Sequence, residues 1–219
     1  LVQSMVAQVA QPVLVSLNGE EGRQKDVFRK MMRFTAFITF PLLFGFGLVA
    51  KEFIVTAIGE KWLASAQLIQ ILCISGATMP LSTLFSNMII SKGRSGTFFW
   101  CTFTLGLVQI ATMIMIWPMG IRTMVIAYTL LNTSWLLVWL FFVRRLIGYG
   151  YWMFFCDVMP FALAAAGVMG VAYVATMPLS NMIALLITRF IIAVVLYYVV
   201  MKIARVKILA ECERFVKRS

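Results

Sequence analysis

Histidine is absent from this 219-residue sequence, and charged residues make up only 12% of it. Without histidine, the chain has no histidine-ligated metal site, no Ser-His-Asp triad and no Cys-His dyad. The four cysteines lie far apart and form no Cys-x-x-Cys pair, so we interpret them as unreactive thiols and expect no metal and no cofactor. Charged residues make up about a quarter of a typical soluble domain, so the low fraction here excludes an ordinary soluble globular protein.

Apolar residues dominate the composition instead. Hydrophobic residues make up 62% of the chain, and the mean hydropathy is +0.95. Six apolar blocks are long enough for membrane-spanning helices, and none alternates as the strand of a membrane barrel would. The sequence therefore predicts an all-α, polytopic integral membrane helical bundle with six complete transmembrane helices plus the tail of a preceding one. The predicted blocks cover residues 34–50, 64–91, 97–117, 123–143, 152–177 and 179–201.

The polar gaps between these blocks define the expected organisation of the chain. Residues 1–17 are too short and too interrupted for a complete span, so we expect the chain to be the C-terminal part of a longer membrane protein. The expected order is the end of a truncated transmembrane helix at 1–17, a charged cytoplasmic linker or surface helix at 18–33, four helices within 34–143, two trailing transmembrane helices within 144–201, and a basic cytoplasmic tail at 202–219.

The net charge of +11 reflects where the basic residues stand. Lysine and arginine occupy the short gaps between apolar blocks, which is the pattern of membrane topology and not of a nucleic-acid-binding face. If the gaps alternate between the two sides of the membrane, one side receives 15 of the 19 basic residues and the other receives 3. The positive-inside rule then predicts that both ends of the chain are cytoplasmic, and we expect no nucleic acid partner.

Three polar residues fall near the middle of apolar blocks: Gln109, Asn132 and Arg189. Each lies roughly 12–15 Å from the outer helix end, so they meet if their helices are neighbours. One interpretation is a substrate site, in which Arg189 binds an anion, because a central arginine costs about 2.5–3.5 kcal/mol and usually faces protein or water. The other is interhelical hydrogen bonding worth about 0.6 kcal/mol for each residue. Asp157 is a poor partner for Arg189, since their depths differ by about 10 Å.

Prolines interrupt three of the blocks, at Pro41, Pro80 and Pro160. Each proline removes one backbone hydrogen bond and clashes with the preceding helical turn. Such breaks flank cavities and hinges in transporters, but proline is also frequent in membrane helices in general. We therefore consider these positions as candidate hinges, with static kinks as the alternative.

Several motifs resemble a known family. They are Gln-Pro-Val-Leu-Val-Ser-Leu at 11–17, Phe-Pro-Leu-Leu-Phe-Gly at 40–45, Ile-Gly-Glu-Lys-Trp-Leu at 58–63 followed by Leu-Ile-Gln-Ile-Leu-Cys at 68–73, and Ser-Lys-Gly-Arg-Ser at 91–95. This succession resembles the Wzx-type lipopolysaccharide and polysaccharide flippases, within the multidrug/oligosaccharidyl-lipid/polysaccharide superfamily. The resemblance covers residues 11–95, and beyond them only the helix pattern agrees.

The resemblance implies a two-lobed bundle that works by alternating access. Such a protein moves undecaprenyl-pyrophosphate-linked oligosaccharide across the bacterial inner membrane, makes no covalent bond and is not an enzyme. Its partners would be that lipid-linked oligosaccharide, membrane lipids and other polysaccharide-assembly proteins. The alternatives are a drug-efflux or lipid II transporter of the same superfamily, a membrane enzyme of polysaccharide assembly, and a non-transporting assembly subunit.

Overall fold

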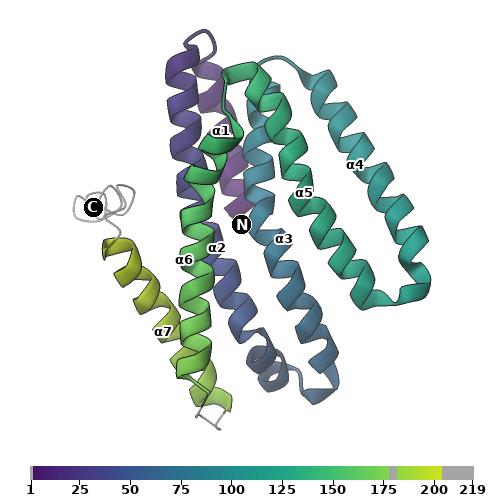
Figure 1. Cartoon of the computed structure of the whole chain (residues 1–219), viewed down its shortest axis with the longest axis vertical. Coiled ribbons are helices and arrows are strands. Elements are labelled where there is room, and N and C mark those ends of the chain that lie inside the picture. Colours follow the sequence, from purple (N-terminus) through teal and green to yellow (C-terminus); the bar gives the residue numbers. More distant parts are fainter. Residues whose placement is uncertain (1, 178–181, 204–219) are drawn as a thin grey trace. The chain divides into compact units, whose positions relative to one another are not determined.

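The computed structural model describes residues 2–177 and 182–203, which are helical apart from short turns (Figure 1). The all-α prediction is confirmed, and six of these helices are long and apolar enough to cross a membrane. In chain order the elements are α1 Val2–Ser16, α2 Glu21–Ala57, the 3-10 helix η1 Glu60–Trp62, α3 Leu63–Ser91, α4 Ser95–Ile116, the 3-10 helix η2 Trp117–Met119, α5 Ile121–Ile147, α6 Tyr151–Ala175 and α7 Met182–Ile203.

Helix α2 differs most from its predicted bounds. It includes most of the segment expected as a linker at 18–33, and it continues past the predicted end of its block, at residue 50, to Ala57. The charged first turns remain helical because one side of them is buried: Gln24, Phe28 and Met32 are inaccessible to solvent and recur every four residues. The Gln24 amide also donates a 2.8 Å hydrogen bond to the carbonyl of Leu14, which ties α2 to the end of α1.

The other helices follow the apolar blocks closely. Helices α3 to α6 begin and end within four residues of the predicted blocks. Two predicted features lie outside the described residues: the turn at 178–179 and, from residue 204 onward, the basic tail. The cytoplasmic placement of that tail therefore stays a prediction.

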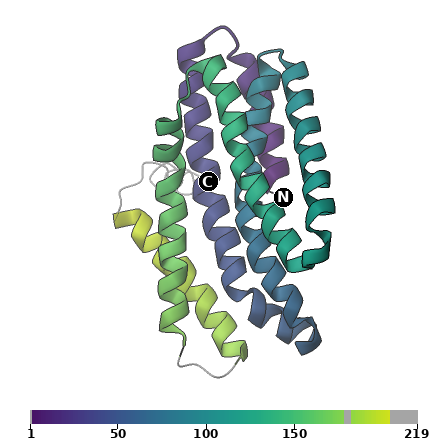
Figure 2. The ribbon, with the colours of Figure 1, turned by 45° about the vertical axis from the view of Figure 1, so that its right-hand side comes forward.

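The chain divides into two compact units, and the first consists of Leu1–Thr39 and Ile71–Met159. Its core is built from large side chains of α2, α3 and α5 that exclude solvent almost completely. Within this unit, α4 packs against α5 as an antiparallel hairpin joined by η2, and both views show the two helices side by side (Figures 1 and 2). Most of the apolar surface of α4 is exposed, as expected for a helix that faces lipid.

The second unit consists of Phe40–Gln70 and Pro160–Ser219. Small residues are prominent in its core, and five alanines are at most 4% exposed. Small side chains let membrane helices approach closely, so this packing suits a bundle within a bilayer. The five alanines are Ala50, Ala66, Ala165, Ala172 and Ala193.

The three candidate hinge prolines all lie inside continuous helices: Pro41 in α2, Pro80 in α3 and Pro160 in α6. Two of them stand at the limits of the compact units, which fall between Thr39 and Phe40 in α2 and between Met159 and Pro160 in α6. Their role as hinges stays a prediction.

Candidate functional site

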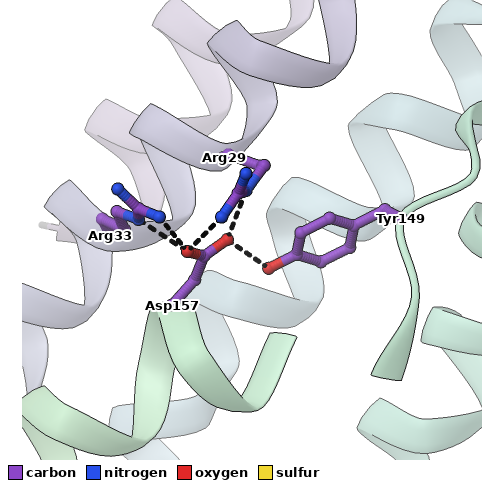
Figure 3. A network of polar contacts seen from close by, with 4 residues as sticks. All are labelled: Arg29, Arg33, Tyr149 and Asp157. Carbon is purple, nitrogen blue, oxygen red and sulfur yellow. Dashed lines mark hydrogen bonds and ion pairs between the residues drawn. The ribbon is translucent and has the colours of Figure 1, made fainter. Parts of the chain in front are cut away.

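A buried carboxylate with two arginines is the most highly charged feature of the first unit (Figure 3). Asp157 lies in the second turn of α6, and its side chain is 0% exposed. Arg29 donates to it twice, from Nε to Oδ2 at 2.9 Å and from Nη2 to Oδ1 at 3.1 Å. Arg33 adds Nε–Oδ1 and Nη2–Oδ1 contacts of 2.6 and 2.5 Å. We name Arg29, Arg33, Tyr149 and Asp157 the Asp157 cluster.

Tyr149 completes the cluster from the turn between α5 and α6. Gly148 ends α5 with a left-handed φ of 65°, which other residues adopt with strain, and this turn directs Tyr149 inward. The Tyr149 hydroxyl donates a 3.2 Å hydrogen bond to Oδ2 of Asp157. Burial, and then the neighbouring carboxylate, raise the pKa of Tyr149 above its usual range, so the phenol stays protonated and remains a donor.

Aromatic packing keeps water from the carboxylate. The Tyr149 ring meets Phe28 edge-on at 5.3 Å between centroids, and Phe85 lies 5.8 Å from both Phe28 and Phe154. Phe28, Phe85 and Tyr149 are completely buried. Because the surroundings are apolar, a carboxylate here needs a positively charged partner, and it contacts two guanidinium groups.

The second unit contains a different buried ion pair. Arg189 of α7 donates from Nη1 to Oε1 of Glu52 in α2 at 2.6 Å, and their side chains are only 6% and 8% exposed. The Nε of Arg189 donates to the Thr176 hydroxyl at 2.9 Å, and the guanidinium lies 4.9 Å from the centre of the Tyr173 ring. One negative charge thus balances one positive charge, which leaves no surplus positive charge for an anion.

The structure gives Arg189 a carboxylate at its own depth, which the predicted blocks did not. The first predicted block ended at residue 50 and left Glu52 outside it, whereas α2 continues to Ala57 and ends only before Gly59, whose φ is 106°. Glu52 therefore lies about 8 Å inside its helix end, and Arg189 lies about 10 Å inside the start of α7. The sequence carried only part of the signal for this pair: the predicted topology puts Glu52 and the start of the last block on the same side of the membrane, but the predicted block ended two residues before Glu52.

The Asp157 cluster was also missed from the sequence. Asp157 was compared only with Arg189, which pairs with Glu52 instead. The predicted topology already put Asp157 and the basic residues at 23–33 on the same side of the membrane. The continuous helix α2 was the missing information, because it turns Arg29 and Arg33, four residues apart, toward one carboxylate.

The other two predicted site residues do meet. Gln109 of α4 donates a 3.2 Å hydrogen bond from Nε2 to Oδ1 of Asn132 in α5. Asn132 in turn donates to the carbonyl of Tyr128 at 2.9 Å. Both amides are half-buried and belong to the first unit, whereas Arg189 belongs to the second. A substrate-binding role for these three residues stays a prediction.

The described residues contain no group of three or more metal-ligating side chains. Both charged sites therefore offer ion pairing and hydrogen bonding, with arginine as the donor in each. Ionisable residues inside membrane helices are costly and are typically paired with one another, as here. The helices and these pairs define a multi-pass helical membrane protein.

Comparisons with known proteins find similarity to polysaccharide biosynthesis proteins. Residues 1–67 match the model of a family described as polysaccharide biosynthesis protein. The chain is 26% identical over 167 residues to the teichuronic acid biosynthesis protein TuaB of Bacillus subtilis (strain 168), covering 75% of this chain and 35% of TuaB. These matches, with two more given below, confirm the resemblance found in the sequence: the chain is similar to polysaccharide biosynthesis proteins, one of them of the Wzx type.

Two further relatives match shorter stretches. An uncharacterized membrane protein in the cps region of Klebsiella pneumoniae is 28% identical over 93 residues, which are 42% of this chain and 19% of that protein. The lipopolysaccharide biosynthesis protein WzxC of Escherichia coli (strain K12) is 23% identical over 90 residues, which are 41% of this chain and 18% of WzxC. No solved structure matches the chain. The chain spans about a fifth to a third of the length of these three relatives, and the TuaB alignment extends beyond the 11–95 range in which the family motifs were found.

Proposed function

We propose that this protein takes part in moving undecaprenyl-pyrophosphate-linked oligosaccharide across the bacterial cytoplasmic membrane, by alternating access and without making or breaking a covalent bond. The observation that carries the proposal is the similarity of a chain with six membrane-length helices to polysaccharide biosynthesis proteins, extending over three quarters of its length for TuaB. The lipid-linked oligosaccharide, membrane lipids and other polysaccharide-assembly proteins are the partners that this function implies.

The charged sites support a transporter more than an enzyme. The buried charged residues of the described helices, Glu52, Asp157 and Arg189, are all engaged in ion pairs. A catalytic site needs an acid, base or nucleophile positioned to reach its substrate. Here the Asp157 carboxylate is instead saturated by four arginine contacts and a tyrosine hydroxyl. The surplus positive charge of this cluster suits a substrate that carries phosphate.

Complementation tests the proposed function. The intact protein is expressed in a bacterial strain that lacks its own polysaccharide flippase, and surface polysaccharide is measured on gels. We expect restored surface polysaccharide, because the translocation step would again be supplied. The control is an empty vector, with the membrane level of the protein measured in the same cells. Normal membrane levels without any rescue, in strains chosen to match the protein's own sugar, would contradict the proposal.

The topology gives a separate prediction. Single cysteines are introduced as Ser95→Cys and Met119→Cys in a protein lacking the native cysteines; both positions are exposed and lie at opposite ends of α4 and η2. If the side with 15 basic residues is cytoplasmic, an impermeant maleimide added outside spheroplasts labels position 119 and not position 95. Labelling after membrane disruption shows that both thiols can react. The reverse pattern would overturn the predicted orientation.

A further inference from the structure

The Asp157 cluster carries more positive charge than it needs to stabilise its carboxylate. Two guanidinium groups face one carboxylate, so the cluster has a net charge of about +1 when Arg29, Arg33 and Asp157 are ionised. A buried carboxylate is already compensated by one well-placed arginine. Arg29 alone supplies a bidentate pair, with contacts of 2.9 and 3.1 Å. Arg33 is therefore a second charge that the carboxylate does not require.

The two arginines are also accessible, unlike the carboxylate between them. The side chains of Arg29 and Arg33 are 29% and 42% exposed, whereas that of Asp157 is 0% exposed. Both guanidinium groups use Nε and Nη2 toward Asp157, and within the described residues no hydrogen bond runs from either Nη1 to a protein acceptor. Each arginine thus keeps its Nη1 donors unused, while its Nε and Nη2 groups bind the Asp157 carboxylate and hold the guanidinium plane in place (Figure 3).

Further basic groups stand beside this edge. Lys25, Arg29 and Arg33 recur every four residues, so they form one stripe along the first turns of α2. The Lys25 ammonium lies 3.7 Å from the position that a Cβ would take on Gly148, which places it next to the turn carrying Tyr149. Arg144, in the last turn of α5, lies over the ring of Tyr151 at 5.5 Å. Positive charge therefore gathers where α2, α5 and α6 meet within the first unit.

The position along α2 fits the level of lipid headgroups. Arg33 is the last charged residue before the apolar stretch that begins at Phe34, so it stands at the boundary between charged and apolar turns. In a bilayer this boundary lies at the interface, where anionic lipid phosphates are found. Guanidinium forks match phosphate oxygens in two-point contacts, which makes arginine a suitable residue for such a ligand.

We propose that Arg29 and Arg33 form a binding site for the phosphate group of a membrane lipid, with Asp157 and Tyr149 as positioning residues that hold the two guanidinium planes. The inference rests on the proposed function for one of its two possible ligands, the pyrophosphate of a lipid-linked oligosaccharide. The other ligand with the same chemistry is the headgroup of an ordinary anionic phospholipid. Binding can be measured without transport, so failure here is distinct from failure of complementation.

The test measures binding to the intact protein purified in a neutral detergent. Undecaprenyl pyrophosphate, phosphatidylglycerol and inorganic pyrophosphate are titrated separately, and native mass spectrometry reports each Kd. Arg33→Gln should raise the Kd for the lipid phosphate about tenfold or more, because charge-assisted contacts are lost. Arg33→Lys should give an intermediate Kd, since it keeps the charge without the fork. Lys30→Gln is the matched control, because Lys30 is an exposed cation on the same helix outside the stripe.

The outcomes separate the possible ligands. Tighter binding of undecaprenyl pyrophosphate than of phosphatidylglycerol assigns the site to the transported lipid, and equal affinity assigns it to lipid headgroups in general. Either result supports the phosphate site if Arg33→Gln weakens lipid binding and Lys30→Gln does not. Equal effects of Arg33→Gln and Lys30→Gln would overturn the proposal, because they would reflect overall charge alone. No binding of either lipid by the wild-type protein would overturn it too. If Arg33→Gln fails to fold, the Kd of Arg33→Lys is compared with that of Lys30→Gln instead, and equal effects again overturn the proposal.

Discussion

Replacing Arg189 by leucine is expected to lower the free energy of unfolding by about 3–5 kcal/mol, because it leaves Glu52 buried without its cation. Glu52 is 6% exposed, and its Oε2 already has no hydrogen-bond partner among the described residues. Loss of Arg189 removes the 2.6 Å contact to Oε1 as well. The measurement is denaturant unfolding of the intact protein in mixed detergent micelles.

A double variant distinguishes the lost pair from a general loss of packing. Combining Arg189→Leu with Glu52→Gln removes both charges, so most of the stability should return, since buried ion pairs can often be replaced by uncharged residues at little cost. Arg122→Leu is the control, because Arg122 is exposed in the first turn of α5 and its loss should change stability by less than about 0.5 kcal/mol. An Arg189→Leu protein as stable as the Arg122→Leu protein would contradict a stabilising role for the pair.

Replacing Asp157 by asparagine should have the second-largest effect. It leaves Arg29 and Arg33 facing one another without the carboxylate that now separates their charges. We expect a loss of about 2–3 kcal/mol, less than for the fully buried Arg189 pair, because both arginines are partly exposed and solvent screens their repulsion. Asparagine has nearly the shape of aspartate, so packing against Tyr149 and the neighbouring aromatic rings is preserved. The same unfolding measurement in detergent reports the change.

Asp26→Asn provides the matched control for this variant. Asp26 is exposed on the same helix as Arg29, and the substitution makes the same chemical change outside the Asp157 cluster. Its effect should stay within about 0.5 kcal/mol. Equal stability of the two asparagine variants would show that the Asp157 contacts do not stabilise the fold, and it would remove the basis for treating Asp157 as the residue that positions the arginines.

The sequence by itself determined the fold class and most helix bounds. Lipid offers no partner for backbone hydrogen bonds, so an apolar block of membrane length must be a helix or a strand of a closed barrel. Because these blocks lack the alternation of barrel strands, they must be helices. The resemblance at residues 11–95 agrees with the similarity to polysaccharide biosynthesis proteins that the comparisons find. The sequence missed the full extent of α2, since a few charged residues do not end a helix whose buried side, carrying Phe28 and Met32, continues through them.

Only the tertiary structure decided how the charges are paired. Gln109 and Asn132 form a polar contact within a helix hairpin, where helices adjacent in sequence also pack together. The ion pairs of the buried carboxylates instead join residues more than 120 positions apart: Arg29 with Asp157, Arg33 with Asp157, and Glu52 with Arg189. Hydropathy fixes the depth of a residue in its helix but not the direction of its side chain around the helix axis. That direction depends on which helices are neighbours, so the surplus charge beside Asp157 and the balanced charge at Arg189 could be told apart only in three dimensions.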